Sequence, residues 1–248
     1  MIKNSLIIPC YNEEGNIKDL IKACKKYLEQ SQNELILVNN GSEDKTEKII
    51  DYYCEKENII KVNVAFNKGF GNGIIAGTKI ARGDIIIYTH ADFEANPEDV
   101  IVGLKILEEN RNDSNNFLIK GKRINKRKNK WSYFDIIISS GLSFLISILF
   151  KKRIYDLHAQ PVIFHKKTIK YFDNAPLDFM FDLYIQLLAI KLNYKIIRFP
   201  VNFNKEKRLY GRGSNDTIIK KINGILNHLF KLKVLKDSIN KINKSDDY

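Results

Sequence analysis

The stretch from Asn67 to Asp99 reads NKGFGNGIIAGTKIARGDIIIYTHADFEANPED, and it predicts the fold of the chain. A glycine-rich turn opens a short helix, residues 82–84 close it, and the β-branched run at 85–87 is typical of a buried strand. This strand leads into His90, Asp92 and Glu94. Because side chains alternate in an extended chain, these three point the same way if strand geometry continues through them. One imidazole and two carboxylates at the carboxyl end of a strand form a candidate site for a divalent metal bound to phosphate oxygens.

The alternation of strand and helix extends back to the N-terminus. Buried strands are expected at 5–8, 34–38, 59–65 and 85–89, with one helix ending near Gln30 and a second that Ser42 can cap. Short connections between alternating elements predict an α/β fold with a doubly wound, mostly parallel sheet. Polar residues follow these strands, and the carboxyl ends of parallel strands meet at the edge where nucleotides bind. They are Asn12, Glu13, Asn39, Asn40, Asn67, His90 and Asp92.

The composition narrows the classes of partner. The chain has 248 residues, 44% of them hydrophobic, and a formal net charge of +12. This length supports a large core, and the charge implies an anionic partner such as nucleotide phosphates, anionic lipid or nucleic acid. No nucleic-acid motif is present and the basic residues do not alternate with aromatics, so we expect no nucleic-acid partner. A Walker loop and a GxGxxG turn after the first strand are absent as well.

The cysteines and the apolar runs bear on cellular location. Cys10, Cys24 and Cys54 lack metal-ligand spacing and are typical of reduced thiols in a cytosolic protein. The chain enters a strand at once, which predicts no signal peptide. No apolar run reaches the roughly 20 residues that span a bilayer. We therefore expect a cytoplasmic protein.

One long segment predicts contact with a membrane surface. Residues 131–150 are apolar around most of a helix, and they lie between a basic stretch at 122–130 and Lys151, Lys152 and Arg153. A buried core helix accounts for the apolar residues, whereas a helix lying in an anionic leaflet accounts for the cations too. The second interpretation makes 131–153 an interfacial helix and the protein peripheral on the inner face of a membrane. Residues 216–248 are expected to form a basic amphipathic helix and a tail.

Several motifs, taken in order, resemble those of family 2 glycosyltransferases with the GT-A fold. They are IPCYNEE at 8–14, VNNGSEDKT at 38–46, NKGFG at 67–71, HAD at 90–92, DLHAQ at 156–160 and RLYGRGS at 208–214. The resemblance covers one catalytic domain at 1–215, and it is greatest to polyprenyl-phosphate glycosyltransferases such as dolichyl-phosphate mannose synthase. It implies transfer of a sugar from a nucleoside-diphosphate sugar to a polyprenyl phosphate, another lipid-linked intermediate or a glycan.

The resemblance also implies roles for particular residues. Asp92 would bind a divalent cation, Mg²⁺ or Mn²⁺, while Arg208 and Arg212 would close over the diphosphate. Metal ions and basic side chains stabilise the negative charge that develops on a leaving diphosphate. The donor itself would contact Pro9, Asn12, Glu13, Asn40, Asn67, Lys68, Gly71, Ala91, Gln160 and Ser214.

Two residues depart from the family pattern. His90 stands in place of the first Asp of an Asp-x-Asp motif, which leaves three alternatives. Either His90 ligates a softer ion such as manganese, or Glu94 supplies the missing carboxylate, or the reaction needs little metal. Asn40 stands in place of the second Asp of Asp-Asp-Gly-Ser, whose carboxylate accepts a hydrogen bond from uracil in several relatives. Because an amide both donates and accepts, Asn40 permits cytosine as well as uracil.

Two acids are expected at the start of a helix over 178–192. Asp178 and Asp182 are spaced i and i+4, which places them on one face near the N-terminus. Asp182 is then a candidate general base for a hydroxyl acceptor. A phosphate acceptor is already ionised, which leaves Asp182 a positioning role, and acids also favour a helix N-terminus for its dipole alone.

Two other classes of protein stay open. A nucleotidyltransferase uses a similar sheet, although its Gly-rich basic loop is missing after Ile8. A non-catalytic nucleotide-binding protein with a basic, membrane-facing surface accounts for the charge and for the altered Asp-x-Asp motif. Sugar transfer that is lost in Asp92→Ala, with the fold intact, distinguishes an enzyme from the latter.

Overall fold

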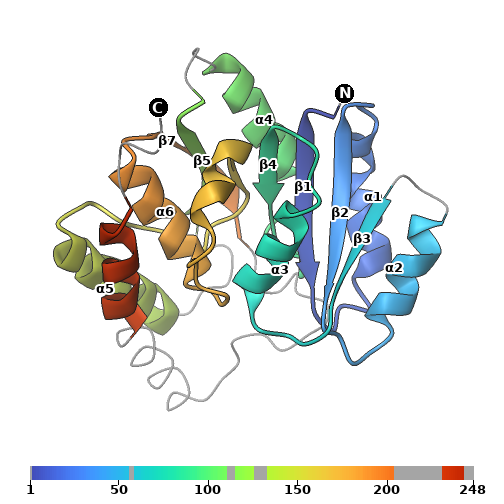
Figure 1. The fold of residues 1–248 in the computed structure, drawn as a ribbon, viewed down its shortest axis with the longest axis horizontal. Helices are drawn as coiled ribbons and strands as arrows, with labels where there is room; N and C mark the ends of the chain where they lie inside the picture. The colour runs from blue at the N-terminus through green and yellow to red at the C-terminus, as the bar shows by residue number, and fades with distance from the viewer. Residues whose placement is uncertain (1, 56–58, 111–114, 126–132, 204–230, 243–248) are drawn as a thin grey trace.

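The computed structural model describes residues 2–55, 59–110, 115–125, 133–203 and 231–242 (Figure 1). Its strands are β1 (Asn4–Cys10), β2 (Asn33–Asn40), β3 (Ile59–Val64), β4 (Ile85–Tyr88), β5 (Phe117–Ile124), β6 (Val162–His165) and β7 (Lys195–Asn202). Its helices are α1 (Ile17–Leu28), α2 (Thr46–Cys54), α3 (Phe70–Thr78), α4 (Asp99–Glu109), α5 (Tyr133–Phe150) and α6 (Phe181–Lys191). A 3₁₀ helix, η1 (Lys166–Tyr171), and a helix over 231–240 complete the described elements.

The strands form one seven-stranded sheet in the order β3-β2-β1-β4-β6-β5-β7. The expected mostly parallel sheet is confirmed, and β6 is the exception because it runs antiparallel to both β4 and β5. After β5 ends at the carboxyl edge, the chain passes through α5 and returns to that same edge, so β6 starts there and runs the opposite way. As a result, residues 156–160, which directly precede β6, lie at the edge where β1, β2 and β4 end.

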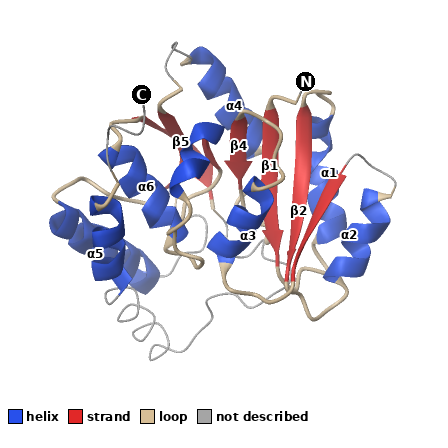
Figure 2. Ribbon diagram, viewed as in Figure 1, coloured by secondary structure: helices blue, strands red, loops and turns tan. Residues whose placement is uncertain are grey.

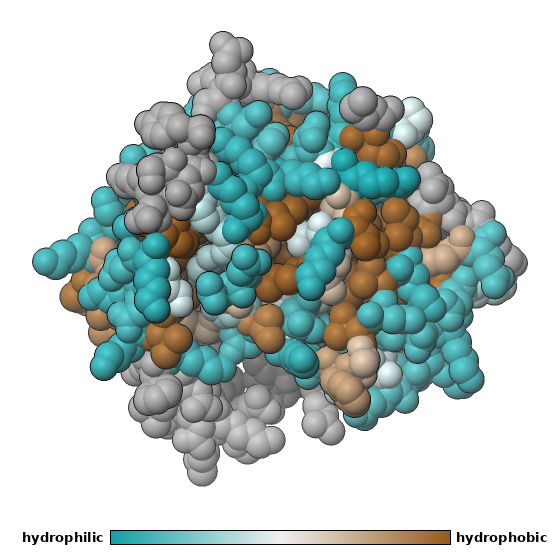
Figure 3. All heavy atoms as spheres, in the orientation of Figure 1, coloured by the Kyte–Doolittle hydropathy of each residue, from teal (hydrophilic) through white to brown (hydrophobic). Residues whose placement is uncertain are grey.

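Helices cover both faces of the sheet, which makes a three-layer α/β domain (Figure 2). On the face of the sheet that α3, α5 and α6 cover, apolar side chains form one cluster. It includes Ile7, Ile36 and Tyr88 from the strands. The opposite cluster joins α1, α2 and α4 to Leu6, Ile8 and Leu35. Alternate residues of β1 and β2 therefore point into different layers, which is why these strands are apolar throughout rather than alternating. On the α3 side, apolar residues of β3 are only partly covered, and hydrophobic surface is visible over β2 and β3 (Figure 3).

Three expected element boundaries are wrong. Helix α2 begins at Thr46 with Lys45 as its N-cap, while the Ser42 hydroxyl instead accepts a hydrogen bond from the Asn12 N–H at 3.2 Å. Helix α6 begins at Phe181, so Asp178 precedes it. Strand β4 ends at Tyr88, and the chain beyond it bends instead of continuing as a strand.

Helix α5 has two unlike faces. Ile146 is buried, and Leu142 and Phe150 pack against the core. Phe144 is 69% exposed and Ile148 58% exposed on the remaining surface. Within the described ranges, none of the helices has the length and apolar character needed to cross a bilayer.

Candidate active site

A cavity of about 660 Å³ opens at the carboxyl edge of the sheet. The structure brings most of the residues expected to bind the donor together around it, from the segments that follow β1, β2, β3 and β4. Its lining consists of Pro9, Tyr11, Asn12, Glu13, Asn40, Glu43, Asn67, Gly69, Phe70, His90, Ala91, Asp92 and Phe179.

Hydrogen bonds tie the segments after β1 and β2 to each other. The Asn12 side chain accepts from the Glu43 N–H at 2.9 Å, and the Thr46 hydroxyl accepts from the Glu13 N–H at 2.7 Å. Gly41 has a φ of +74°, and a Cβ there would lie 2.5 Å from the backbone nitrogen of Asn67. Only glycine tolerates both the positive φ and the short distance to the backbone of Asn67. Gly41 therefore allows the segment at Asn67 to pack directly on the end of β2.

Asn40 lines the cavity and has one buried oxygen without a hydrogen-bond partner among the described residues. Its Nδ2 donates to the Gly69 carbonyl at 3.0 Å, and the side chain is only 3% exposed. If Oδ1 and Nδ2 of Asn40 were exchanged, Oδ1 would face the carbonyl oxygen of Gly69. This contact therefore determines the orientation of the Asn40 amide. Oδ1 is buried and has no hydrogen-bond partner among the residues that the structure describes. Because Asn40 lines the cavity, this oxygen is a candidate acceptor for a hydrogen bond from a bound ligand.

His90 is packed among aromatic rings. It stacks on Phe70 with ring centroids 4.5 Å apart, and the rings of Phe179 and Phe203 lie 6.3 and 6.4 Å away. Burial lowers the pKa of His90, although Asp92 and Asp182 oppose that shift, so its imidazole is neutral at physiological pH.

The expectation that His90, Asp92 and Glu94 point the same way is wrong. Phe93 has a φ of +61°, and the Asp92 Oδ1 accepts a hydrogen bond from the Glu94 N–H at 3.1 Å. The chain turns at this point, which leaves Asp92 in the cavity lining and Glu94 outside it. Over the described ranges, no three His, Cys, Asp or Glu side chains gather to hold a metal ion.

Asp182 is fully buried behind the cavity and accepts hydrogen bonds on both oxygens. Oδ1 accepts from the Tyr88 hydroxyl at 2.8 Å and from the Gln160 amide at 3.1 Å, and Oδ2 lies 3.1 Å from the His158 Nδ1. Burial alone would raise the pKa of Asp182, but Lys120 and His158 lower it to about 2. A buried carboxylate with this pKa is a poor proton acceptor, so its surroundings favour the positioning role.

Asp178 and Asp182 do not share a helix face, contrary to expectation. Asp178 precedes α6, where it accepts from the Met180 N–H at 2.9 Å and forms an ion pair with Lys231. It is partly exposed, whereas Asp182 points into the core from the first turn.

The sequence motifs did not indicate Lys120, which is fully buried on β5. Burial lowers its pKa to about 8, partly offset by Asp182, and Nζ has no hydrogen-bond partner within the described part of the chain. A lysine inside the apolar strand FLIKG is the signal that could have revealed it. Beside it, Arg123 and Asp156 form a buried ion pair.

The remaining expected donor contacts lie elsewhere. Lys68 lines a separate groove, and Gly71 packs so closely on the Pro176 carbonyl that a Cβ would overlap it. Gln160 is buried against Asp182. The positions of Arg208, Arg212 and Ser214 lie outside the described residues.

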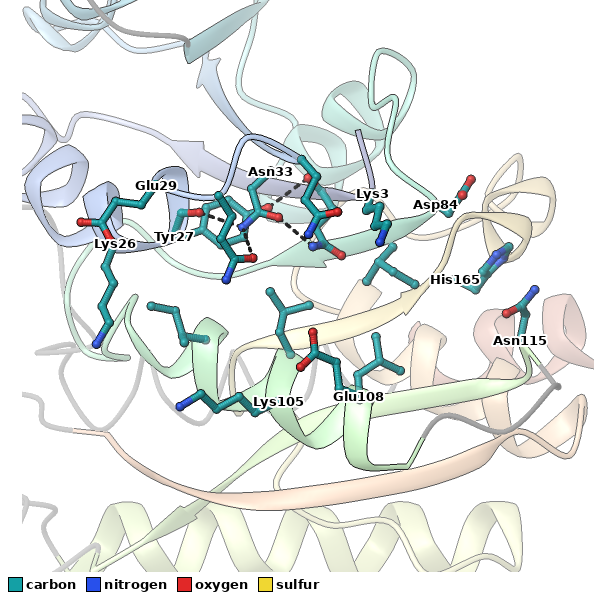
Figure 4. A pocket seen from close by; sticks show the side chains of 17 residues that line it. Lys3, Lys26, Tyr27, Glu29, Asn33, Asp84, Lys105, Glu108, Asn115 and His165 are labelled. Carbon is teal, nitrogen blue, oxygen red and sulfur yellow. Dashed lines mark hydrogen bonds between the residues drawn. The ribbon is translucent and has the colours of Figure 1, made fainter. Parts of the chain in front are cut away.

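A second hollow, of about 500 Å³, lies at the opposite edge of the sheet. Figure 4 shows its floor, where Asn33 donates to the Tyr27 carbonyl at 2.7 Å and accepts from Asn4 at 2.7 Å. None of the unpaired buried side-chain atoms found among the described residues belongs to its lining. The carboxyl-edge cavity, which contains the unpaired Asn40 acceptor, is therefore the better candidate site.

The order of the strands and the helices on both faces of the sheet define a domain with the GT-A fold. Glucosyl-3-phosphoglycerate synthase of Mycobacterium tuberculosis, solved with Mn²⁺, UDP-glucose and phosphoglyceric acid, superimposes with a TM-score of 0.69 and 14% identity over 98% of this chain and 81% of that chain. TarS of S. aureus, solved with UDP, gives a TM-score of 0.56 and 23% identity over 80% and 58% of the two chains. Residues 5–182 match the model of glycosyl transferase family 2, and the chain belongs to that family.

Curated relatives include lipid-phosphate glycosyltransferases. A dolichyl-phosphate β-glucosyltransferase of Trichomonas vaginalis is 27% identical over 211 residues, which are 81% of this chain and 65% of that protein. The dolichol-phosphate mannosyltransferase of Pyrococcus furiosus is 25% identical over 98% of this chain and 67% of its own length. The human dolichyl-phosphate β-glucosyltransferase is 32% identical over 61% of this chain and 51% of its own length. The chain thus spans about two thirds or less of these relatives.

Proposed function

We propose that this chain transfers a sugar from a uridine-diphosphate sugar to the phosphate of a polyprenyl lipid. Its family and the lipid-phosphate transferases among its relatives support this class of reaction. The observation that carries the proposal is the carboxyl-edge cavity of about 660 Å³, which is lined by both Asp92 and Asn40, and the Asn40 Oδ1 has no hydrogen-bond partner among the described residues. That volume is within the usual range for small-molecule sites.

The choice of uridine over cytidine rests on Asn40, and its choice over guanosine rests on the UDP and UDP-glucose in solved structures of similar fold. Its Oδ1 can accept a hydrogen bond from the N3–H of uracil. Cytosine has an unprotonated N3, and pairing with it would use the second N–H of the Asn40 Nδ2, whose orientation is set by its hydrogen bond to the Gly69 carbonyl. Uracil needs only Oδ1, which has no hydrogen-bond partner among the described residues, and this difference favours uracil over cytosine.

The residues present fit a divalent cation that is held mainly by the donor. Mg²⁺ typically binds one or two protein carboxylates together with substrate phosphates and water, rather than a cage of protein ligands. Asp92 supplies such a carboxylate at the cavity wall. A bound cation would neutralise charge on the leaving diphosphate. We assign the protein ligand to Asp92 and give His90 an aromatic packing role.

The cations that gather at the same edge of the sheet suit an anionic lipid surface. Lys122, Arg153 and Arg198 surround the ring of Tyr155, at 5.9, 5.7 and 4.3 Å from its centroid. A phosphate acceptor is a ready nucleophile and needs no general base, which agrees with the burial of Asp182. Asp182 then holds His158 and Gln160 in place instead of removing a proton.

Helix α5 supports attachment to a lipid surface. Its exposed apolar side chains are followed directly by the exposed cations Lys151, Lys152 and Arg153. Apolar area enters the headgroup boundary while lysine and arginine pair with anionic lipid. We accordingly propose a peripheral protein on the cytoplasmic face of a membrane.

The test is transfer of labelled sugar from a panel of UDP, GDP and CDP sugars into a lipid extract that contains polyprenyl phosphate. UDP sugars should be used best, and Asp92→Asn should abolish transfer. Asp19→Asn, an exposed acid on α1, is the matched control and should be fully active. Absence of labelled lipid with every donor, from folded protein, would overturn the proposal.

A further inference from the structure

Two loops form a continuous wall beside the donor cavity. The Asn72 N–H donates to the Leu177 carbonyl at 2.8 Å. Gly69, with a φ of +118°, lies so close that a Cβ would be 2.6 Å from the same carbonyl. Segment 67–72 and segment 176–180 are therefore held in direct backbone contact.

Residues of this wall line hollows on both of its sides. Gly69, Phe70 and Phe179 line the donor cavity. Lys68, Leu177 and Met180 line a groove of about 370 Å³ on the other side of the wall. The groove thus adjoins the donor cavity across a single layer of chain.

The groove has an apolar floor with charges at its margin. One side is Pro176, Leu177 and Met180, and the other is Val234 and Leu235 from the helix over 231–240. Leu177 is 40% exposed and Val234 is 62% exposed, so apolar surface is left open to solvent on both sides. The cations are Lys68, which is exposed, and Lys231, which pairs with Asp178.

We propose that this groove binds the first isoprene units of the lipid acceptor, an inference that rests on the proposed function. A prenyl phosphate is apolar along its chain and anionic at one end. The groove matches that pattern, because it joins an open apolar lining to Lys68, whose neighbours Asn67 and Gly69 line the donor cavity. A prenyl chain in the groove removes apolar surface from water and leaves its phosphate beside the wall of the donor cavity.

The experiment compares two acceptors that differ only in chain length, farnesyl phosphate and dimethylallyl phosphate. Leu177→Asn/Val234→Asn replaces two exposed apolar side chains, so the fold should be kept. With saturating UDP sugar, the KM for farnesyl phosphate should rise about tenfold through lost apolar contact, while that for dimethylallyl phosphate stays within about twofold. Val102→Asn, on the exposed side of α4, is the matched control and should change neither KM. Affinity for UDP should be unchanged in both variants.

Three other results of this experiment would contradict either the groove or the proposed function. If the KM values for the two acceptors change equally, or if neither changes, the proposal that the groove binds prenyl chains is wrong. A changed oligomeric state of the double variant would instead make the groove a contact between copies of this chain, and the proposal would be wrong. If the wild type transfers to neither short acceptor, calorimetric binding of farnesyl phosphate to the wild type and the double variant decides whether the groove binds prenyl chains. Transfer to the polyprenyl phosphate of the lipid extract then decides the proposed function separately.

Discussion

Replacing Asn40 should remove the selection of the nucleotide base without removing the cavity. In the wild type, Oδ1 is a buried acceptor with only 3% of the residue exposed. Uracil satisfies it with N3–H, whereas cytosine sets its own N3 acceptor against it. An unpaired buried polar group costs about 1 to 3 kcal/mol. At about 1.4 kcal/mol for each tenfold step, CDP should bind roughly 5- to 150-fold more weakly than UDP.

Three variants separate the acceptor from other effects. Asn40→Asp keeps an acceptor, so UDP should still bind better than CDP, although loss of the Gly69 hydrogen bond lowers stability. Asn40→Ala has neither group, and the two affinities should become nearly equal. Asn39→Ala is the matched control, because Asn39 is buried nearby but its Oδ1 accepts from the Ser42 N–H at 3.2 Å and is not part of the cavity lining. It should lower thermal stability and keep the preference for UDP.

Isothermal titration calorimetry of UDP and CDP with each folded variant measures the ratio directly. A wild type that binds CDP as tightly as UDP would refute the reasoning. So would a preference for UDP that survives unchanged in Asn40→Ala, because base selection would then lie in residues other than Asn40.

Three further predictions concern the cation, acid stability and the membrane. Mn²⁺ binding, measured by electron paramagnetic resonance, should be strong only when UDP is present. It should be lost in Asp92→Asn and should persist in His90→Phe. Equal Mn²⁺ binding without UDP would contradict a cation that is held mainly by the donor. The folded pKa of Asp182, about 2, is below its ordinary value of 3.8, so its contribution of about 2 kcal/mol is present above pH 4 and is lost as the pH falls through 2. Urea unfolding at pH 4, 3 and 2 should show this loss in the wild type and in Asp19→Asn but not in Asp182→Asn; an equal slope in all three proteins would show that Asp182 does not titrate in this range. Binding to anionic vesicles should weaken with salt and should fail, with the fold retained, when exposed α5 residues are replaced by serine, whereas loss of the folded protein would make this face core. Those residues are Phe144, Leu145 and Leu149, and Val102→Ser is the matched control.

Much of the fold and part of the site follow from local sequence. The apolar runs of β1, β2 and β4, with polar residues directly after each, predict a parallel sheet and the edge at which Asn12, Asn40 and Asp92 gather. This works because strand direction and short connections allow few arrangements, and because the residues that end adjacent parallel strands must share one edge. The direction of β6 and the start of α6 depend on how the chain returns to the sheet. The local sequence pattern does not predict that path.

The amino-acid sequence by itself determined the α/β class, the position of the cavity and the residue types that it contains. Only the tertiary structure decided what those residues can do, because hydrogen-bonding capacity and ionisation depend on neighbours distant in the chain. The Gly69 carbonyl makes Asn40 an acceptor, and Phe70, Phe179 and Phe203 make His90 part of an aromatic cluster. Tyr88, His158 and Gln160 enclose Asp182. An amide, an imidazole and a carboxylate each have several roles available in water, and burial beside particular partners leaves each of them one.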